Sequence, residues 1–163
     1  MKKDDAQGMT LYSWDVFKIL LDYEVNRSQR YPNPLTLLDM SIEPQPNTPE
    51  IVKAAETNIA ILLNSRLRSA DIPAHFKEDY FVLLPITDEP GGRAVCERML
   101  SIFKGPFATE HGESYTLSVR IGLTTSLGGS NLSAEVLIQQ ASSALKNALS
   151  QSSKLYVSYS DLK

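Results

Sequence analysis

The feature that most constrains the fold is a tight, charged turn between two strand-like runs of the sequence. Residues 72–76 and 80–85 are rich in apolar and aromatic side chains, and Lys77, Glu78 and Asp79 separate them. Two extended runs joined by so few polar residues predict a β-hairpin with charged groups at its tip. The other elements of the chain can be placed around this hairpin.

Apolar stripes at helical spacing flank the hairpin on both sides in the sequence. Ser13, Thr48 and Ser133 stand where helices are expected to begin, because a hydroxyl oxygen can accept a hydrogen bond from a free backbone N–H group of the first turn. Strands are expected where apolar residues run together or alternate with polar ones. The predicted helices cover about residues 11–25, 48–68, 95–103 and 133–148, and the further strands cover about 35–42, 117–123 and 155–159.

This order, α-β-α-β-β-α-β-α-β, predicts an α+β domain. Strands separated by helices, with one tight hairpin in the middle, are typical of a ferredoxin-like βαββαβ core. The chain adds an N-terminal helix in front of that core and a C-terminal helix–strand pair behind it. With 163 residues, of which 42% are hydrophobic, one domain can bury a core, whereas two domains would be small. We therefore expect one domain over residues 10–163, preceded by a flexible polar segment, residues 1–9.

Composition and charge exclude several classes of function. The formal net charge of −3 argues against a nucleic-acid polymer as a partner, because binding a phosphate backbone needs a basic face. No apolar run approaches the ~20 residues of a membrane-spanning helix, so we expect no direct membrane insertion. The single Cys96 cannot form an internal disulfide, and the first residues lead into no apolar signal segment. These features indicate a cytoplasmic domain.

Asp39 and Asp79 are the two carboxylates most expected to meet. Asp39 lies near the end of the apolar run 35–42, where a buried charge needs an interaction partner or a function, and Asp79 lies at the hairpin tip. Clustered carboxylate oxygens suit a hard cation such as Mg²⁺ or Ca²⁺. The alternative is a pair of acids with no metal bound.

Several segments together resemble the GGDEF domains of diguanylate cyclases. They correspond to the first metal-binding strand of that family, its inhibitory Arg-x-x-Asp motif, its signature hairpin, a later strand and the helix beside the active site. In chain order these segments are Leu37–Asp39, Arg68–Asp71, Ala74–Phe81, Ser118–Gly122 and Ala141–Ala148. The resemblance covers about residues 11–157 and implies that the ferredoxin-like core is of the nucleotidyl cyclase type.

The departures from the family pattern fall on residues that its chemistry requires. Lys77 and Glu78 stand where the family has two glycines at the hairpin tip, and their side chains take up space that a bound nucleotide would need. Ser41 and Tyr80 replace two of the expected acids, although the two aspartates named above are retained. The resemblance therefore implies that substrate entry is obstructed and that the metal site is incomplete.

The positions that would grip the nucleotide are also changed. Asn47 stands where the family places a guanine-contacting asparagine, but Val52 and Lys53 replace the glycine–aspartate pair expected after it. Leu149 and Ser153 stand at the positions of two basic residues that hold the triphosphate. Little remains to neutralise a triphosphate, so Asn47 and the two aspartates are left as vestigial active-site positions.

By contrast, the resemblance implies that the product-binding inhibitory site is complete. Arg68 and Asp71 precede the hairpin at the family spacing, and Arg98 occupies the position of a second arginine in the third helix. A guanidinium can donate two hydrogen bonds to guanine or to phosphate, and a carboxylate can accept from guanine N–H groups. Two arginines and one acid thus match cyclic di-GMP. The structural alternative is an exposed i,i+3 ion pair that finishes a helix.

The resemblance and its departures imply a catalytically inactive domain, with at most a residual Mg²⁺ and no other cofactor, that acts as a cyclic di-GMP receptor. Its output would be contact with another protein, with a flanking domain or with a second copy of itself in a homodimer. The alternatives are a ligand-free interaction or dimerisation module and, third, a divergent active nucleotidyl cyclase that uses the two aspartates. Among the remaining residues, Cys96 is expected in the core, His75 and His111 are expected to be structural or solvated, and Arg120 either fills the vacated nucleotide pocket or lies on the surface.

Overall fold

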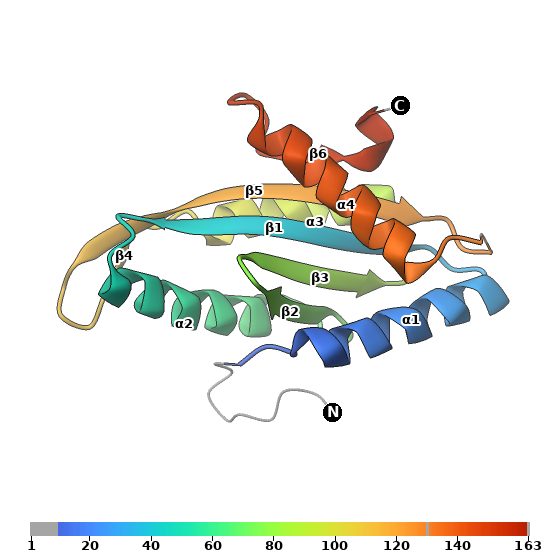
Figure 1. Ribbon diagram of the computed structural model, residues 1–163, viewed down its shortest axis with the longest axis horizontal. Helices are drawn as coiled ribbons and strands as arrows, with labels where there is room; N and C mark the ends of the chain where they lie inside the picture. Colours follow the sequence, from blue (N-terminus) through green and yellow to red (C-terminus); the bar gives the residue numbers. More distant parts are fainter. Residues whose placement is uncertain (1–9, 130, 163) are drawn as a thin grey trace.

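The structure is a computed structural model that describes residues 10–129 and 131–162, and the predicted flexible segment 1–9 lies outside the described residues. Figure 1 shows helices packed against one long, twisted sheet. The elements follow one another as α1 (Trp14–Arg30), β1 (Leu35–Gln45), α2 (Pro49–Arg66), β2 (Ile72–Phe76), β3 (Asp79–Pro85), α3 (Glu89–Ile102), β4 (Phe107–Ala108), β5 (Ser114–Ser126), α4 (Ala134–Leu149), β6 (Tyr156–Ser158) and the 3-10 helix η1 (Tyr159–Leu162).

Each α-helix begins at a capping side chain. The hydroxyls of Ser13, Thr48 and Ser133 accept hydrogen bonds from the backbone N–H three residues further on, at 3.3, 3.4 and 3.2 Å. Asp88 caps α3 in the same way and accepts from the Gly91 N–H at 2.9 Å. These bonds satisfy N–H groups that the first turn of a helix leaves free. The three hydroxyl caps are the ones predicted from the sequence.

The sheet has the ferredoxin-like topology that the sequence predicts, with two short additions. Its strand order is β2-β3-β1-β5-β4, with β6 beside β5. Strand β1 pairs antiparallel with β3 on one side and with β5 on the other, so its residues lie at the centre of the sheet. The strand β4 and the helix η1 are not predicted by the sequence pattern, because elements of two and four residues are too short to show a period.

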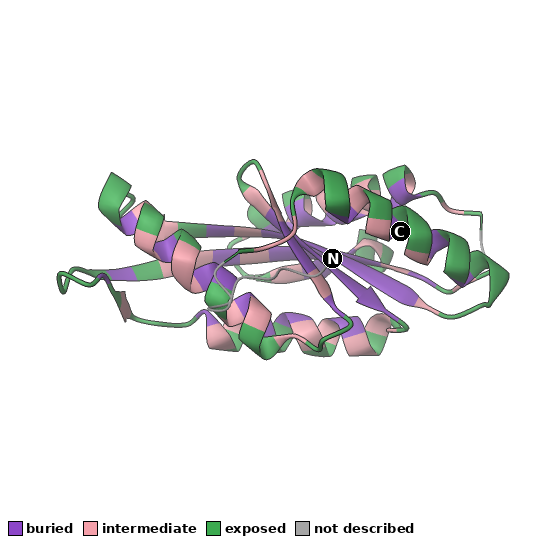
Figure 2. Ribbon diagram, turned by 90° about the horizontal axis from the view of Figure 1, so that it is seen from below, coloured by how far each residue is buried: buried purple, intermediate pink, exposed green. Residues whose placement is uncertain are grey.

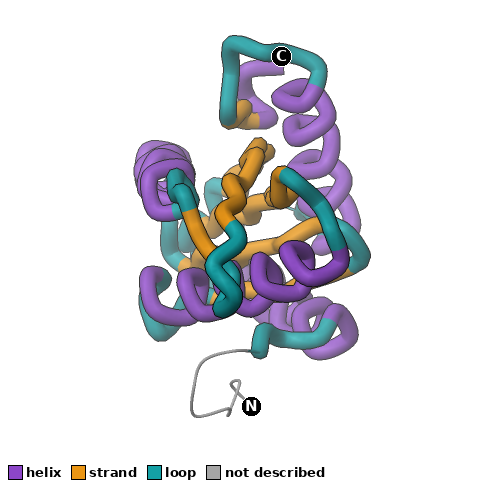
Figure 3. Tube along the Cα trace, turned by 90° about the vertical axis from the view of Figure 1, so that its left-hand side faces the viewer, coloured by secondary structure: helices purple, strands orange, loops and turns teal. Residues whose placement is uncertain are grey.

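Two hydrophobic cores cover the two faces of the sheet. Helices α2 and α3 pack on one face, around Leu38 and Val82, and helices α1 and α4 pack on the other, around Leu37 and Leu83. Successive residues of a strand point to opposite faces, which is why Leu37 and Leu38 belong to different cores. Figure 3 shows the strands enclosed between helices, and Figure 2 shows the buried residues concentrated along the strands.

The bounds of two elements differ from the predicted ones. Helix α2 ends at Arg66, so the Arg-x-x-Asp segment lies in the turn between α2 and β2 and not on the helix. Strand β1 continues to Gln45 instead of ending at Ile42. Cys96 lies in the core as predicted, and burial raises the pKa of its thiol. Within the described ranges, no helix is long and apolar enough to cross a bilayer.

Candidate ligand-binding site

The turn between α2 and β2 holds a buried carboxylate against an arginine. Asp71 Oδ2 accepts from the Arg68 backbone N–H at 2.9 Å, and Asp71 Oδ1 accepts from Arg68 Nη2 at 2.7 Å and from Nε at 3.1 Å. The Asp71 N–H in turn donates to the Arg68 carbonyl at 3.0 Å. The side chain of Asp71 is 0% exposed, whereas that of Arg68 is 54% exposed. The alternative of an ion pair exposed at a helix end is therefore wrong for the carboxylate.

Arg68 also ties this turn to the end of β3. Its Nη2 donates to the Pro85 carbonyl and to Thr87 Oγ1, in both cases at 3.0 Å. These contacts hold the Nε and Nη2 side of the guanidinium, while half of the side chain remains open to solvent. Sequence reasoning missed Pro85 and Thr87, because they lie 17 and 19 residues further along the chain and belong to no motif.

Arg68 and Arg98 face the same hollow, which has a volume of about 370 Å³. Arg68 comes from the turn after α2, and the exposed Arg98 comes from α3. The hollow is also lined by Thr87, Asp88 and Gly91 at the beginning of α3, which is the positive end of that helix. The structure thus brings together two guanidinium groups that lie 30 positions apart in the sequence. This arrangement suits an anion.

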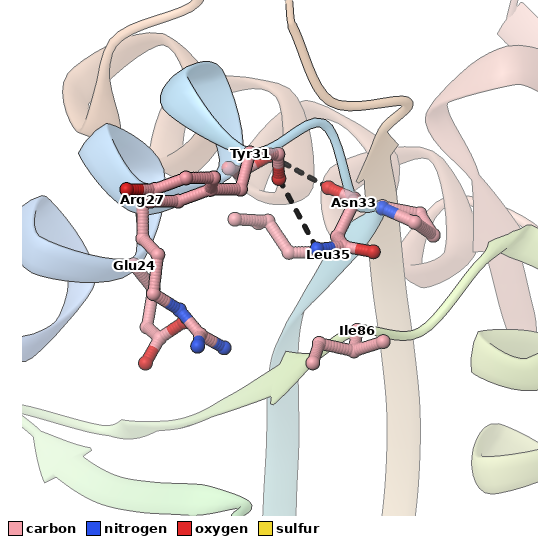
Figure 4. A pocket seen from close by; sticks show the side chains of 8 residues that line it. Glu24, Arg27, Tyr31, Asn33, Leu35 and Ile86 are labelled. Atoms are coloured by element: carbon pink, nitrogen blue, oxygen red, sulfur yellow. Dashed lines mark hydrogen bonds and ion pairs between the residues drawn. The ribbon is translucent and has the colours of Figure 1, made fainter.

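A smaller hollow adjoins this one, and Pro34 and Ile86 line both. Figure 4 shows it from close by, with Ile86 from the loop after β3 and Arg27 and Tyr31 from the end of α1. Its volume of about 10 Å³ leaves room for roughly one water molecule. Ile86 has a φ of 50°, which a β-branched residue rarely adopts, and it is 56% exposed. Ile86 therefore offers an exposed apolar side chain at the border of the larger hollow.

The hairpin tip is a two-residue turn with a strained first residue. Phe76 and Asp79 are the last pair between β2 and β3, so Lys77 and Glu78 form the turn. Lys77 has a φ of 56°, a left-handed conformation that glycine adopts without strain. The two turn residues are exposed, and together with Asn47 they line a second hollow. The turn thus has a backbone shape that suits glycine, with two long side chains added at the edge of this hollow.

The structure brings Asp39 and Asp79 together at the base of the hairpin. Asp39 lies opposite Gly122 in the strand register. Helix α4 comes so close to this glycine that a Cβ on Gly122 would lie 2.2 Å from the Leu145 backbone nitrogen. Asp39 is consequently 1% exposed. Burial, with the hydrogen bond and the charge of Asp79, raises the pKa of Asp39 to about 9. At neutral pH the pair therefore holds a proton between its carboxyl groups. Asp39 Oδ1 has no hydrogen-bond partner in the described part of the chain.

The remaining predicted positions are dispersed. Ser41 pairs with Asp79 on one side and with Arg120 on the other in the strand register. Arg120 does not line the hollow at the hairpin; its Nη1 donates to the Val119 carbonyl at 3.1 Å, and it borders a hollow beside the end of α3. His111 is exposed, 3.8 Å from a Glu50 carboxylate oxygen. Over residues 10–129 and 131–162, no three His, Cys, Asp or Glu side chains gather closely enough to hold a metal ion.

Comparison with known proteins gives matches among solved structures only. No family model matches the chain, and no curated protein sequence matches it. The GGDEF domain of TpbB, also called YfiN, from Pseudomonas aeruginosa has a TM-score of 0.78 at 17% identity, and the match covers 96% of this chain and 92% of that one. The GGDEF domain of FimX from the same organism has a TM-score of 0.75 at 17% identity, with 97% and 98% covered. The coiled coil and GGDEF domain of DgcB from Caulobacter crescentus, in complex with c-di-GMP, has a TM-score of 0.78 at 12% identity, with 92% and 82% covered.

The sheet, with its helices on both faces, defines an α+β domain with a core of the nucleotidyl cyclase type. More narrowly, the chain has the fold of GGDEF domains, which confirms the fold that the sequence resemblance implies. Identities of 12–17% establish the fold and do not carry the chemistry. The activity has to be argued from the residues of this chain.

Proposed function

We propose that residues 10–163 form a catalytically inactive GGDEF-like domain that binds cyclic di-GMP through Arg68 and Arg98. The observation that carries the proposal is the hollow that these two arginines share at the beginning of α3. Cyclic di-GMP offers two phosphates and two guanines, and a guanidinium can donate to a phosphate or to guanine O6 and N7. The fold is also that of the DgcB GGDEF domain, which was solved in complex with c-di-GMP.

We assign Asp71 a positioning role at this site. Its carboxylate is closed off from solvent and fixes the direction of the Arg68 guanidinium through bonds to Nε and Nη2. An arginine that is already ordered loses less side-chain entropy when a ligand binds. Direct acceptance from guanine N–H groups, the role that the sequence resemblance implies, would require Arg68 to turn away and uncover Asp71. In the described conformation the two arginines therefore carry the ligand contacts.

Three features support the loss of cyclase activity. The side chains of Lys77 and Glu78 stand at the hollow beside the hairpin tip. Asp39 keeps its proton at neutral pH, so a divalent ion would have to displace that proton before it could bind. Leu149 and Ser153 offer no positive charge to a triphosphate. A nucleotide would therefore lack both the metal and the clamp that align phosphates for in-line attack.

The output of ligand binding would pass through α3. Arg98 faces the ligand hollow, while Arg93 on the same helix forms ion pairs with Glu89 and with Asp161 of η1, both at 2.8 Å. A ligand that shifts α3 would therefore also shift the C-terminal segment. We propose that a partner protein, a flanking domain or a second copy of the chain recognises this change. In support, the diguanylate cyclase SiaD, which matches this fold over 55% of its chain, was solved in complex with its activator SiaC.

Calorimetric titration of cyclic di-GMP tests the proposal. Wild type should bind, and Arg98→Ala should weaken binding by about tenfold or more, because hydrogen bonds to charged groups contribute roughly 1.5–3 kcal/mol. Arg98 is exposed and outside the core, so its loss leaves the fold intact. Arg68→Lys, which keeps the charge but not the forked geometry, should weaken binding as well.

Arg66→Ala is the matched control, because Arg66 is an exposed arginine two positions from Arg68 that does not line the hollow. It should bind cyclic di-GMP like the wild type. Absence of heat with the wild type, or equal affinity for Arg98→Ala and Arg66→Ala, would contradict the receptor and favour a ligand-free interaction module. Incubation with GTP and Mg²⁺ tests the other half of the proposal, since formation of cyclic di-GMP would refute the inactive site.

A further inference from the structure

The hollow beside the hairpin tip is rich in carboxylates. Glu43 at the end of β1, Glu56 on α2 and Glu78 in the turn all line it, and its volume is about 310 Å³. This volume falls at the lower end of the range for small-molecule sites, roughly 300–1,000 Å³. No described lysine or arginine forms an ion pair with any of the three. The carboxylates therefore leave a negative charge that nothing in the hollow offsets.

Lys77 is the one lysine or arginine among the residues that line this hollow, and its ammonium group contacts an aromatic ring. Its Nζ is 5.2 Å from the centroid of the Phe76 ring, a cation–π contact. The Phe76 ring stacks on Trp14 with 4.3 Å between centroids, and both belong to the core between the sheet and α1, on the opposite face from α2. The ammonium group thus lies over an aromatic ring and forms no ion pair with the three carboxylates.

A tyrosine that is almost fully buried lies at the same hollow. Tyr80 is 3% exposed and lines the hollow, and its ring stacks on His75 with 4.1 Å between centroids and 9° between planes. Its hydroxyl makes no hydrogen bond to any described residue. Tyr80 and Glu56 line the same hollow, and burial, with the charge of Glu56, raises the pKa of Tyr80. The hydroxyl oxygen itself is not closed off from the hollow, so a ligand there can donate a hydrogen bond to it.

We propose that this hollow binds a small organic cation, an alkyl-ammonium or guanidinium compound, whose N–H groups donate to Glu56, Glu78 and the Tyr80 hydroxyl oxygen. All three groups can accept hydrogen bonds, and only a cation matches the charge. A metal ion fits less well, because no three ligating side chains in the described part of the chain come close enough together. A nucleoside triphosphate is repelled by the same carboxylates. The proposal is independent of cyclic di-GMP, since this hollow shares no residue with the one at Arg68 and Arg98.

Titration with agmatine and with putrescine, in calorimetry and in thermal melting at low salt, tests the inference. Agmatine should bind and raise the melting temperature, whereas GTP should not bind. Glu56→Gln should weaken agmatine about tenfold, because a charge-assisted hydrogen bond becomes a neutral one. Tyr80→Phe removes only the hydroxyl from a buried ring and should weaken agmatine about threefold with little change in stability.

Glu110→Gln is the control, because it removes the same charge from an exposed residue that lines a different hollow. It should leave agmatine affinity unchanged, as should Arg98→Ala. No binding to the wild type, or the same affinity in Glu56→Gln as in the wild type, would overturn the proposal. Equal weakening by Glu110→Gln and Glu56→Gln would also overturn it, because the attraction would then be that of the overall charge.

Discussion

Asp71 and Asp39 are equally buried, each 1% exposed, but the two aspartates have opposite neighbours. Asp71 lies against Arg68, which donates from Nη2 at 2.7 Å and from its backbone N–H at 2.9 Å. Asp39 lies against a second acid, Asp79, and the pKa of Asp39 rises to about 9. A bare buried charge is costly in both places, so one carboxylate is neutralised by a cation and the other by a proton.

The two aspartates therefore differ in the charge that they leave at their sites. At Asp71 the charge is retained, and the arginine that balances it presents its free side to the hollow shared with Arg98. At Asp39 the carboxyl group holds a proton at neutral pH, because burial and the neighbouring Asp79 raise its pKa. The first region presents positive charge to a hollow, whereas the second is an acidic pair that shares a proton.

The largest effect is expected from breaking the first pair. Asp71→Ala should lower the free energy of unfolding by about 2–3 kcal/mol, because the Arg68 backbone N–H and guanidinium lose a buried, charged acceptor. Urea unfolding at neutral pH measures this. Asp22→Ala removes an exposed aspartate from α1 and should change stability by less than about 0.5 kcal/mol. If the two variants were equally stable, the buried ion pair would have no structural role.

The second pair should respond to pH with a defined sign. Because the pKa of Asp39 is about 9 in the folded state and 3.8 for an unperturbed aspartate, the folded state binds the extra proton between these values. Stability should therefore fall as pH rises through that window, by at most ~1.4 kcal/mol per pH unit. Asp39→Asn cannot release the proton, so between about pH 5 and pH 8 wild type should lose at most about 4 kcal/mol relative to it. Parallel stability curves for the two proteins would show that Asp39 is ionised in the folded state.

The two arginines of the ligand hollow should differ in their effect on stability. Arg68→Ala leaves Asp71 with only a backbone donor and should cost about 1–2 kcal/mol, which is discounted because the arginine is half exposed. Arg98→Ala should cost less than about 0.5 kcal/mol. Thermal and urea unfolding of the two variants compare them directly. Equal losses would mean that Arg98 has a structural partner of its own.

The smallest effect is expected at the hairpin tip. Lys77→Gly should stabilise the domain by about 0.5 kcal/mol, because relief of the left-handed strain exceeds the entropy that glycine adds to the unfolded chain. Glu78→Gly, at a residue without a positive φ, should not stabilise it. Neither change should produce cyclase activity, since the proton on Asp39 and the missing basic residues at 149 and 153 remain. Activity in Lys77→Gly with GTP and Mg²⁺ would show that the turn alone blocks catalysis.

The element order and the strand topology could be predicted from the sequence because long periodic segments carry that information. The apolar run of β1 and the alternation in β5 predict strands, and Ser13, Thr48 and Ser133 mark helix starts through local hydrogen bonds. The short strand β4 has no such signal, because its pairing depends on Tyr115 and Ser114 further along the chain. Local sequence patterns were thus enough to predict the helices and strands that local interactions define.

The candidate site was harder to predict because its geometry depends on distant segments. The spacing of Arg68 and Asp71 suggests a surface pair on a helix, but α2 stops at Arg66 and the turn buries the carboxylate. That Arg98 faces the same hollow as Arg68 depends on how α3 packs, which no local pattern contains. That Arg120 is half-buried beside the end of α3, away from the hollow at the hairpin, depends likewise on packing between distant segments.

The proton held by Asp39 and Asp79 also bears on how the domain depends on its surroundings. A metal-bridged acid pair ties folding to the supply of a divalent ion, whereas water supplies a proton at every ion concentration. The folded state should therefore have the same melting temperature with EDTA as with Mg²⁺ at neutral pH. The stability of such a domain should therefore vary with pH, through the raised pKa of Asp39, and not with the concentration of Mg²⁺.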